Sequence, residues 1–416
     1  KTKATVKVDK VEYGSRYRLK IAGVLTTDYI TRNEDHWTVG SGSNDQLLNA
    51  QEILTQLSTH IGSLSLAGTM TVTQLTASLE LEYTDSNGDP LAFTIEAIDD
   101  SGNTRLSVFQ EQVNTIADLP TESKTNRVIQ VINSATNGDS YYSTFIPTEG
   151  TSGPGYWKET VKPGISTALD ASTLPHELFN DAQNSFVFRQ ATWIGRESGD
   201  ETTNEAPSFV NEKIQQTFLH NNRLGILTED NVVMSKSSDF YNFFFTSALT
   251  STDNDPIDIS CSSIRPALLH GIVPTAQGLI LFSKNQQFMM FSDEGAITPS
   301  TAIIRGISNY EMDTNIDPID VGTNINFVSK TESYSRVFGM TTKGYDENPI
   351  VQDVSRVVSE WIPSAIDNIF SSPQNDVTGL YSSSSDYIYM YRVYNVGDER
   401  LMQSWFSWKL PGKVQH

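Results

Sequence analysis

The stretch "LILFSKNQQFMMF" at 279–291 places two apolar runs on either side of a short polar segment. Apolar runs separated by Ser, Asn and Gln are typical of two β-strands joined by a tight turn. We therefore predict strand, turn, strand for this stretch. Two other segments have the same form, "VVMSKSSDFYNFF" at 232–244 and "INFVSKTESYSRVFGM" at 325–340.

A Ser-Lys pair follows the first apolar run in each segment, at intervals of 48 and 46 residues: Ser235-Lys236, Ser283-Lys284 and Ser329-Lys330. A weaker copy is "GLYSSSSDYIYMYRVY" at 379–394, and "NSFVFRQATW" at 184–193 lies roughly one period upstream. A repeat of about 47 residues with several strands is typical of β-propeller blades. We predict a mainly β fold with a β-propeller-like domain. A β-sandwich with evenly spaced hairpins is the alternative.

The motif Asp-Pro-Ile-Asp occurs twice, at 255–258 and 317–320, each time ahead of a predicted strand. Asp before Pro favours an extended turn, and the next Asp can bond its own backbone, so the motif supports the repeat. A calcium site at Asp253, Asp255 and Asp258 is the functional alternative. These residues lack the oxygen-rich spacing and central Gly of a calcium loop.

Residues 1–180 show no such period. Ser43 and Gln46 predict the start of a helix whose apolar face runs from Leu47 to Ile61 and which ends at Gly62. A second possible helix covers 122–135. The alternating segments around these predict strands, so this part is expected to be α+β.

These patterns predict three parts of the chain. We expect an α+β domain at 1–150, a linker at 151–183 that begins in a Gly/Pro/Ser-rich loop, and a β-propeller-like domain at 184–416. The chain starts with Lys1 and has no evident terminal element, so we expect it to be part of a longer protein, with the last domain incomplete at its C-terminus.

The chain is acidic, with 29 Lys and Arg against 50 Asp and Glu and a formal net charge of −21. This balance disfavours proteins that grip nucleic acid phosphates or anionic membrane surfaces. Cys261 is the single cysteine, so an intrachain disulfide and a thiolate zinc site are excluded. No apolar run is long enough to suggest a transmembrane helix.

No catalytic, metal or cofactor motif is recognisable. The six histidines do not form a helical metal pair, and a nucleophile elbow, a P-loop and a dinucleotide fingerprint are all missing from the sequence. We expect no catalytic residue, no metal and no cofactor. The aromatic segments "YNFFF" at 241–245 and "YIYMYRVY" at 387–394 could offer sugar platforms, although packing between sheets is the simpler interpretation.

The stretch from Ala191 to Phe244 resembles the tail tubular B, or nozzle, proteins of short-tailed phages. It contains a Trp, an Arg, Gly-Asp, Thr-Asn, Pro-Ser-Phe, Asn-Arg-Leu-Gly and Asn-Phe-Phe in the order of that family. With Trp157 upstream, the residues that match the family pattern are Trp157, Trp193, Arg196, Asp200, Asn204, Pro207, Phe209, Asn222, Arg223, Gly225, Ser235, Asp239, Asn242 and Phe243.

The resemblance extends over about residues 140–416 and has two departures. Glu205 stands where the family often has Pro, and Asn211 where it often has Gly, so the loop at 204–212 is expected to differ. The shared residue types suit turns and cores, and they mark a scaffold rather than an active site.

The resemblance implies a structural, non-enzymatic virion protein of the short tail. It implies a platform-like first domain and a propeller-like nozzle domain, with six copies forming a hexameric ring or tube. The implied partners are the tail adaptor (tail tubular protein A), the portal indirectly, the tail fibres, and the bacterial envelope at the distal end. Viral DNA would pass through the channel without specific binding.

Two other functions stay open at this point. One is a carbohydrate-binding or glycan-cleaving β-propeller at the host surface, because two carboxylates suffice for glycoside cleavage and the chain has many. The other is a general propeller scaffold for protein interactions, which shares the repeat and leaves the 191–244 match without an account.

Overall fold

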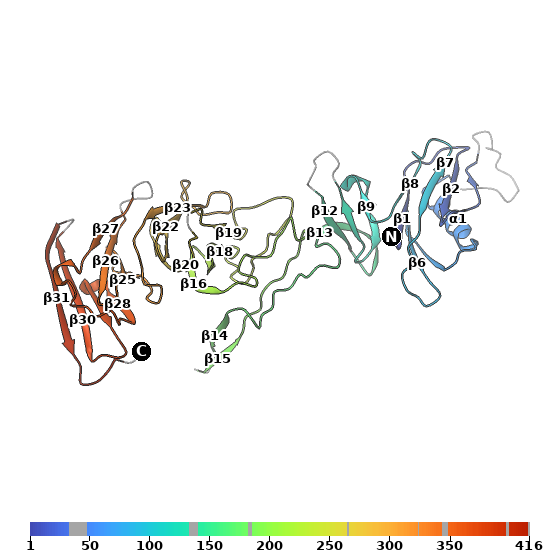
Figure 1. Ribbon diagram of the computed structural model, residues 1–416. Helices are drawn as coiled ribbons and strands as arrows, with labels where there is room; N and C mark the ends of the chain where they lie inside the picture. Colours follow the sequence, from blue (N-terminus) through green and yellow to red (C-terminus); the bar gives the residue numbers. More distant parts are fainter. Residues whose placement is uncertain are drawn as a thin grey trace. The chain divides into compact units, whose positions relative to one another are not determined.

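The computed structural model describes residues 1–32, 48–132, 140–181, 185–263, 266–322, 324–342, 348–396 and 399–414. The chain divides into two compact units (Figure 1). The first comprises Lys1–Thr167, Glu197–Asn204 and Ser247–Leu249, and the second comprises Ala168–Arg196, Glu205–Thr246 and Thr250–His416.

The first unit begins with two small sheets and a helix around one core. One sheet has the order β5-β6-β1-β8, and the other has the order β3-β2-β4 with β7 also paired to β2. Side chains such as Val6, Leu19 and Leu81 are fully buried between them. The bounds are β1 Lys3–Val8, β2 Arg16–Ile21, β3 Val24–Leu25, β4 Tyr29–Ile30, α1 Ala50–Gly62, β5 Thr69–Gln74, β6 Ser78–Thr84, β7 Ile95–Asp99 and β8 Leu106–Phe109.

Helix α1 confirms the predicted apolar face, because Ile53, Leu54, Leu57 and Ile61 are its buried residues. The predicted start is wrong. The helix begins after Asn49, whose side chain accepts a hydrogen bond from the Glu52 amide at 2.7 Å. An Asn at this position satisfies one of the free amides of the first turn, as a cap should. The predicted cap residues Ser43 and Gln46 lie outside the described residues.

A five-stranded sheet of order β10-β13-β12-β11-β9 completes the first unit. The second predicted helix is wrong, because its described residues form β10 and β11. In β11 the β-branched residues Ile129 and Val131 face a core and their neighbours do not, which is the period of a strand. The bounds are β9 Gln112–Val113, the 3₁₀ helix η1 Ile116–Asp118, β10 Glu122–Lys124, β11 Val128–Val131, β12 Tyr141–Pro147 and β13 Ser152–Thr160. Strand β13 thus falls inside the expected linker.

A buried ion pair joins β6 to the segment before β11. The Glu80 carboxylate lies 3.6 Å from Nε of Arg127 and accepts hydrogen bonds from Ser123 at 2.6 Å and Thr5 at 3.0 Å. Burial raises the pKa of Glu80, and the nearby Arg127 charge offsets part of that rise. Burial likewise lowers the pKa of Arg127. Both groups are therefore held in place at a desolvation cost.

The described residues of the second unit form four antiparallel sheets of four strands each, with the strands in chain order, and one two-stranded antiparallel sheet. This arrangement confirms the predicted mainly β, propeller-like domain after an α+β part. The bounds are β16 Ile214–His220, β17 Arg223–Thr228, β18 Asn231–Met234 and β19 Ile257–Ser260 in the first sheet, β20 Leu269–Thr275, β21 Gly278–Ser283, β22 Gln287–Phe291 and β23 Ile303–Ser308 in the second, β24 Ile319–Asp320, β25 Ile325–Lys330, β26 Ser335–Thr341 and β27 Ile350–Asp353 in the third, and β28 Asn368–Ser372, β29 Val377–Tyr381, β30 Tyr387–Val396 and β31 Glu399–Lys409 in the fourth. The 3₁₀ helices η2 Arg356–Val358 and η3 Pro373–Asn375 lie in connections.

Neighbouring sheets share their cores. In β21, Leu279 and Leu281 pack with residues of the β16–β19 sheet, whereas Ile280 and Phe282 pack with residues of the β24–β27 sheet. Successive strand residues point to opposite faces, so a sheet covered on both faces needs apolar residues at every position. This explains why the run "LILF" is continuously apolar.

The repeat register predicted from Ser-Lys is wrong for its first copy. Ser283 ends β21 and Ser329 lies near the end of β25, which are the second strands of their sheets. Ser235 instead follows β18, the third strand of its sheet, and the position equivalent to Ser283 is Thr228 at the end of β17. The two Asp-Pro-Ile-Asp motifs also differ, since one enters the last strand of a sheet and the other the first.

The upstream stretch at 184–193 is not a further four-stranded sheet. Its described residues include β15, Phe186–Gln190, which pairs with β14, His176–Asn180, in a two-stranded antiparallel sheet. In Figure 1 this hairpin is the green pair of strands labelled β14 and β15.

Candidate functional site

Arg223 is the centre of the family-like block. It begins β17 directly after Asn222, whose positive φ of 58° suits the tight turn from β16. The buried guanidinium donates to four backbone carbonyls, of Ser235 at 2.8 Å, Asp255 at 2.6 Å, Asp253 at 2.6 Å and Asn254 at 3.4 Å. Burial lowers the pKa of Arg223, and the charge of Asp255 acts in the opposite direction. Arg223 thus ties β17 to the segments after β18 and before β19.

Asp255 is fully buried beside this arginine. Its carboxylate accepts hydrogen bonds from the backbone and hydroxyl groups of Thr246 and Thr252, at 2.7 to 3.2 Å. Burial raises the pKa of Asp255, but these hydrogen bonds outweigh it and the net pKa is lowered. Asp255 therefore closes a loop and holds it against Arg223.

The calcium alternative fails on this geometry. The carboxylate of Asp258 accepts from the Ser208 amide at 2.8 Å and from the Asn231 side chain at 2.9 Å, so it serves a different turn from that of Asp255. Asp253 contributes its backbone carbonyl to Arg223. Within the described part of the chain, no three His, Cys, Asp or Glu residues form a group that could hold a metal ion.

Ser235 and Gly225 fit the backbone of the first sheet closely. The buried Ser235 hydroxyl accepts a hydrogen bond from the Leu224 amide at 3.0 Å. Gly225 lies opposite Phe218 on β16, and the ring of Phe218 occupies the space that a Cβ would need. A side chain at 225 would therefore require the ring of Phe218 to move.

A turn after Ser235 depends on the polar residues of the block. The side-chain amide of Asn242 donates to the Asp239 carboxylate at 3.2 Å, and the backbone carbonyl of Asn242 accepts from the backbone amide of Lys236 at 2.8 Å. The side-chain oxygen of Asn242 also accepts from the Phe244 amide at 3.2 Å. These bonds turn the chain so that Phe243 enters the core.

Phe243 packs in an aromatic cluster on the outer side of the first sheet. Its ring lies 5.0 Å from that of Phe209 and 5.9 Å from that of Trp193. Pro207 is buried, and its backbone carbonyl accepts a hydrogen bond from the Val210 amide at 2.9 Å. This bond turns the chain around Phe209. Arg196, three residues after Trp193, is also buried, and its guanidinium carbon lies 5.2 Å from the ring centre of Phe244.

Three of the family-like residues lie in the first unit. Trp157 on β13 donates from its indole to the Pro120 carbonyl at 2.8 Å. Asn204 is buried and donates to the Ser198 carbonyl at 3.0 Å. Burial raises the pKa of Asp200, but hydrogen bonds from the two following threonines outweigh it and lower that pKa to about 2.

The loop at 204–212 contains both departures from the family pattern. Asn211 has a φ of 68°, in the left-handed region where Gly is unstrained and Asn is tolerated. This explains how Asn can stand where the family often has Gly. Glu205 is exposed, so a charged residue at that position meets water.

The family-like residues therefore do not converge on one site. Eleven of them surround the first sheet of the second unit, and the other three lie in the first unit. Eight of the fourteen are buried, and several bond backbone groups through their side chains, as scaffold residues would. Their role as family markers stays a prediction. Sequence reasoning missed Phe218, and it considered Asp255 as a turn residue or a calcium ligand but not as the buried carboxylate beside Arg223. A Gly opposite an aromatic residue across a predicted hairpin was the available signal for Phe218.

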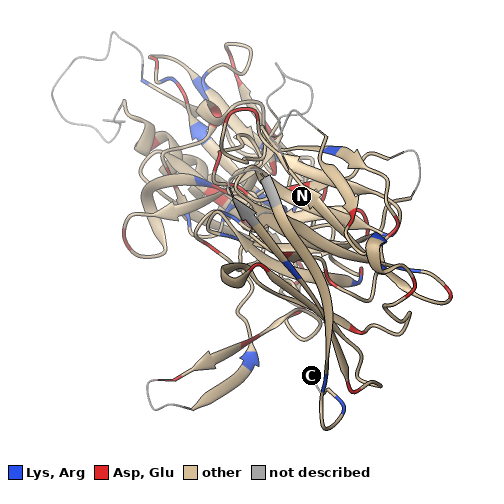
Figure 2. Cartoon of the chain, turned by 90° about the vertical axis from the view of Figure 1, so that its left-hand side faces the viewer, with Lys and Arg blue, Asp and Glu red and all other residues tan. Residues whose placement is uncertain are grey.

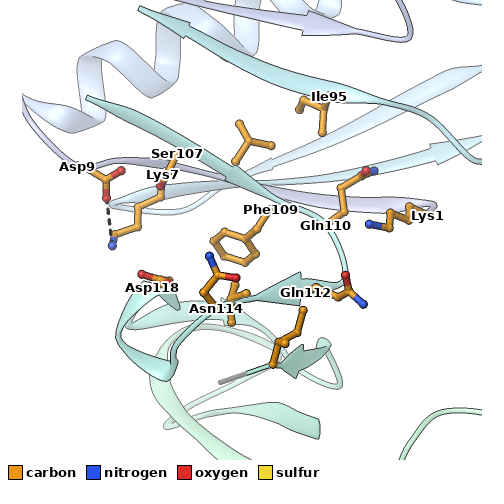
Figure 3. Close-up of a pocket in the computed structure, with 13 residues that line it drawn as sticks. Lys1, Lys7, Asp9, Ile95, Ser107, Phe109, Gln110, Gln112, Asn114 and Asp118 are labelled. Atoms are coloured by element: carbon orange, nitrogen blue, oxygen red, sulfur yellow. Dashed lines mark ion pairs between the residues drawn. The ribbon is translucent and has the colours of Figure 1, made fainter. Parts of the chain in front are cut away.

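An open pocket lies in the first unit and has a volume of about 610 Å³. Figure 3 shows Phe109 near its middle, with Lys7 and Asp9 at one side. Those two charges pair with each other at 3.2 Å.

Cys261 of the second unit is buried, and burial raises the pKa of its thiol to about 12, so it is a poor nucleophile.

Acidic side chains are spread over many loops and strands, with Lys and Arg among them (Figure 2). Such dispersal fits a solubilising surface better than a single ion-binding patch. None of the helices in the described residues is long and apolar enough to span a membrane.

Two solved structures show weak overall similarity. A protein from Lactobacillus plantarum has a TM-score of 0.33 and 12% identity, with 78% of this chain and 94% of that protein covered. A quinonprotein alcohol dehydrogenase-like protein from Bacteroides thetaiotaomicron has a TM-score of 0.29 and 8% identity, with 92% and 74% covered. These scores carry no argument, so the fold rests on the sheets themselves.

The sequence is similar to tail tubular protein gp12 of Escherichia phage T7, with 26% identity over 302 residues. The aligned part is 71% of this chain and 37% of the T7 protein, so the chain spans little more than a third of that relative's length. The family model of the bacteriophage nozzle protein matches residues 1–416. This confirms the resemblance noted in the sequence. The chain belongs to the bacteriophage nozzle protein family.

Proposed function

We propose that this chain is a structural subunit of a phage tail nozzle, which retains the genomic DNA and then conducts it during ejection. The single observation that carries the proposal is the family match over residues 1–416. Family membership places the chain in the tail of the virion. A structural role needs no catalytic step, and we propose that the chain is not an enzyme.

The fold suits a rigid wall. Neighbouring sheets of the second unit share closely packed cores, and protein interiors of this kind resist compression. Buried hydrogen bonds, such as those from Arg223 to four backbone carbonyls, further fix the loops of the first sheet. A conduit for DNA under pressure requires such stiffness.

The acidic balance supports passage of DNA without binding. Tight binding to DNA depends on Lys and Arg that displace counterions from phosphates. A chain with a net charge of −21 repels a polyanion, and carboxylates along a channel would keep DNA from adhering to the wall.

We further propose that six copies form a hexameric ring. The ring would bind the tail adaptor on one side, with the portal beyond it, and would meet the bacterial envelope at its distal end. Contacts with tail fibres also belong to this proposal. A closed ring requires a head-to-tail contact between two different surfaces of the same chain.

The carbohydrate-directed alternative is not favoured by the comparisons. Two of the aromatic residues considered as sugar platforms are also engaged in packing. Tyr241 lies 5.4 Å from Trp193 and donates to Glu177, and Tyr391 is 3% exposed and packs against Trp405. These rings support a scaffold rather than a sugar site.

Electron-microscope class averages of the chain, alone and with the adaptor, test the proposal. We expect sixfold rings with an axial hole in at least the sample with adaptor. Monomers in both samples would overturn the ring and move attention to a screen for glycan binding.

A further inference from the structure

The paired strands β14 and β15, residues 176–180 and 186–190, are defined here as the arm. Its two strands pair over five residues, and within the described part of the chain no third strand pairs with either edge. An isolated two-stranded hairpin is only marginally stable in water. The arm therefore needs either firm anchoring or a partner.

The base of the arm is firmly anchored in its own unit. Glu177 pairs with Arg189 across the strands at 2.5 Å and accepts a hydrogen bond from the Tyr241 hydroxyl at 2.7 Å. Just before and after the arm, Leu174 and Ala191 are buried. The arm thus leaves the first sheet from two fixed ends.

Beyond its base the arm exposes apolar side chains on both faces. The exposed fractions reach 66% for Leu178, 67% for Phe186 and 72% for Phe188, with Phe179 and Val187 at 47% and 43%. None of these five belongs to a hydrophobic core cluster of the described residues. So concentrated an exposed apolar surface marks an interaction site.

The sequence of the arm argues against insertion into a lipid bilayer. Asp181 follows β14, and its carboxylate accepts hydrogen bonds from Ser185, which precedes β15, at 2.6 and 3.0 Å. A hairpin that entered a membrane tip first would carry this carboxylate into the hydrocarbon region, which is costly. The exposed apolar side chains lie on the strands between this carboxylate and the base of the arm, as in a strand pair that enters a protein groove.

The charge of the arm suits contact with a second copy of this chain. Copies that each carry −21 repel one another, so a contact between them needs an apolar surface that adds no further negative charge. The strands of the arm bring one carboxylate and one guanidinium, which neutralise each other. The open strand edges also offer backbone donors and acceptors to a neighbouring chain.

We propose that the arm of one copy packs into the next copy around the ring and thereby sets the head-to-tail contact. This inference rests on the proposed ring, and it adds the surface that closes it. Exchange of an arm of this kind between identical subunits creates the heterologous contact that a closed ring requires.

Two measurements on the full chain with its adaptor test the arm. In the first, a photoreactive benzoylphenylalanine replaces Phe188, and copies labelled with nitrogen-14 and nitrogen-15 are mixed before assembly and irradiation. Leu219, which is 65% exposed on β16, carries the same probe as the matched control. We expect cross-linked peptides of mixed isotope from position 188 and few from position 219. Cross-links from position 188 within a single isotope only would overturn the inference.

The second measurement compares the double variant Phe186→Asp with Phe188→Asp against Leu219→Asp. All three side chains are exposed, so melting temperatures should stay close to that of the wild type. We expect the arm variant to need about tenfold or more protein for half-assembly, and the control to assemble normally. Rings from the arm variant at the wild-type concentration would overturn the inference and leave the ring standing.

Failure of the ring itself gives a different result, namely a wild-type chain that stays monomeric with the adaptor. Flotation with neutral phosphatidylcholine vesicles tests whether the arm binds lipid instead of a second copy of the chain. If the arm variant loses flotation while its rings persist, the arm binds lipid and the inference is wrong.

Discussion

The ring of Phe218 on β16 covers Gly225, its cross-strand neighbour on β17, so closely that a Cβ at 225 would overlap the ring. The fourth sheet repeats the relationship, because Phe370 on β28 covers Gly379 on β29 in the same way. An aromatic ring that shields a strand glycine replaces the packing that the glycine lacks. In both sheets the pair joins the first strand to the second.

Replacing Gly225 with Ala should destabilise the second unit by about 1 to 3 kcal/mol, because the ring of Phe218 must move out of a packed position. Urea unfolding followed by tryptophan fluorescence measures the change. Gly412→Ala is the matched control, since nothing lies near the position of its Cβ. Phe218→Leu in the Gly225→Ala background should recover part of the loss. Equal stabilities of Gly225→Ala and the control would refute the steric account.

Replacing Arg223 with Ala should cost about 3 kcal/mol, because four backbone carbonyls in a largely buried setting lose their donor. Arg223→Lys should recover little, since one ammonium cannot reproduce the planar fork. Thermal unfolding measures both, and tail assembly provides a second readout. Arg336→Ala, at an exposed position, is the control. Normal particles and normal stability from Arg223→Ala would show that the hydrogen bonds of Arg223 are dispensable.

The sequence predicts the repeat of strands but not its register. The repeat can be recognised because sheets covered on both faces need unbroken apolar runs such as Leu279–Phe282. The register is not visible, because Ser-Lys suits any turn and so occurs after a third strand at Ser235 as well as after a second strand at Ser283. Turn chemistry alone cannot distinguish the strands of a blade.

The helix and the site show the same limit. The face from Ile53 to Ile61 has a clear helical period, whereas its cap at Asn49 competed with other polar residues upstream. The resemblance indicated Arg223, but its hydrogen-bond partners are backbone carbonyls, which every residue type has, so the sequence cannot identify them. Such contacts become visible only when the loops that supply them are placed.

Asp200 should stabilise the folded chain in a pH-dependent way. Its pKa is lowered from 3.8 to about 2, so the contribution is present above pH 3.8 and is lost as the pH falls through about 2. The stability difference between wild type and Asp200→Asn should therefore be constant near neutral pH and vanish in strong acid. Urea unfolding between pH 2 and pH 7 measures it, in the range where both proteins fold. A difference that grows towards acid would contradict the assignment.

Replacing Arg127 with Met should cost about 3 to 5 kcal/mol, because Glu80 would remain buried without its counter-charge. The pKa of Glu80 is already raised by burial from 4.5, and the loss of Arg127 should raise it further. Stability tied to this group is present below pH 4.5 and is lost as pH rises through the raised pKa, so the variant should be weakest at neutral pH.

The double variant Glu80→Gln with Arg127→Met controls for packing. It removes the charge from both positions and should be more stable than Arg127→Met alone at pH 7. If the two variants unfold at the same urea concentration at every pH, the buried carboxylate is not the cause of the loss.

The cores that neighbouring sheets share have a consequence for how such a chain changes over evolutionary time. Each face must match only the face opposite it, as the face of Leu279 and Leu281 matches the first sheet and that of Ile280 and Phe282 matches the third. Two facing surfaces can thus drift together without resembling any other pair. Duplicated blades can lose their common sequence while they keep a common shape, which accounts for the faintness of the repeat.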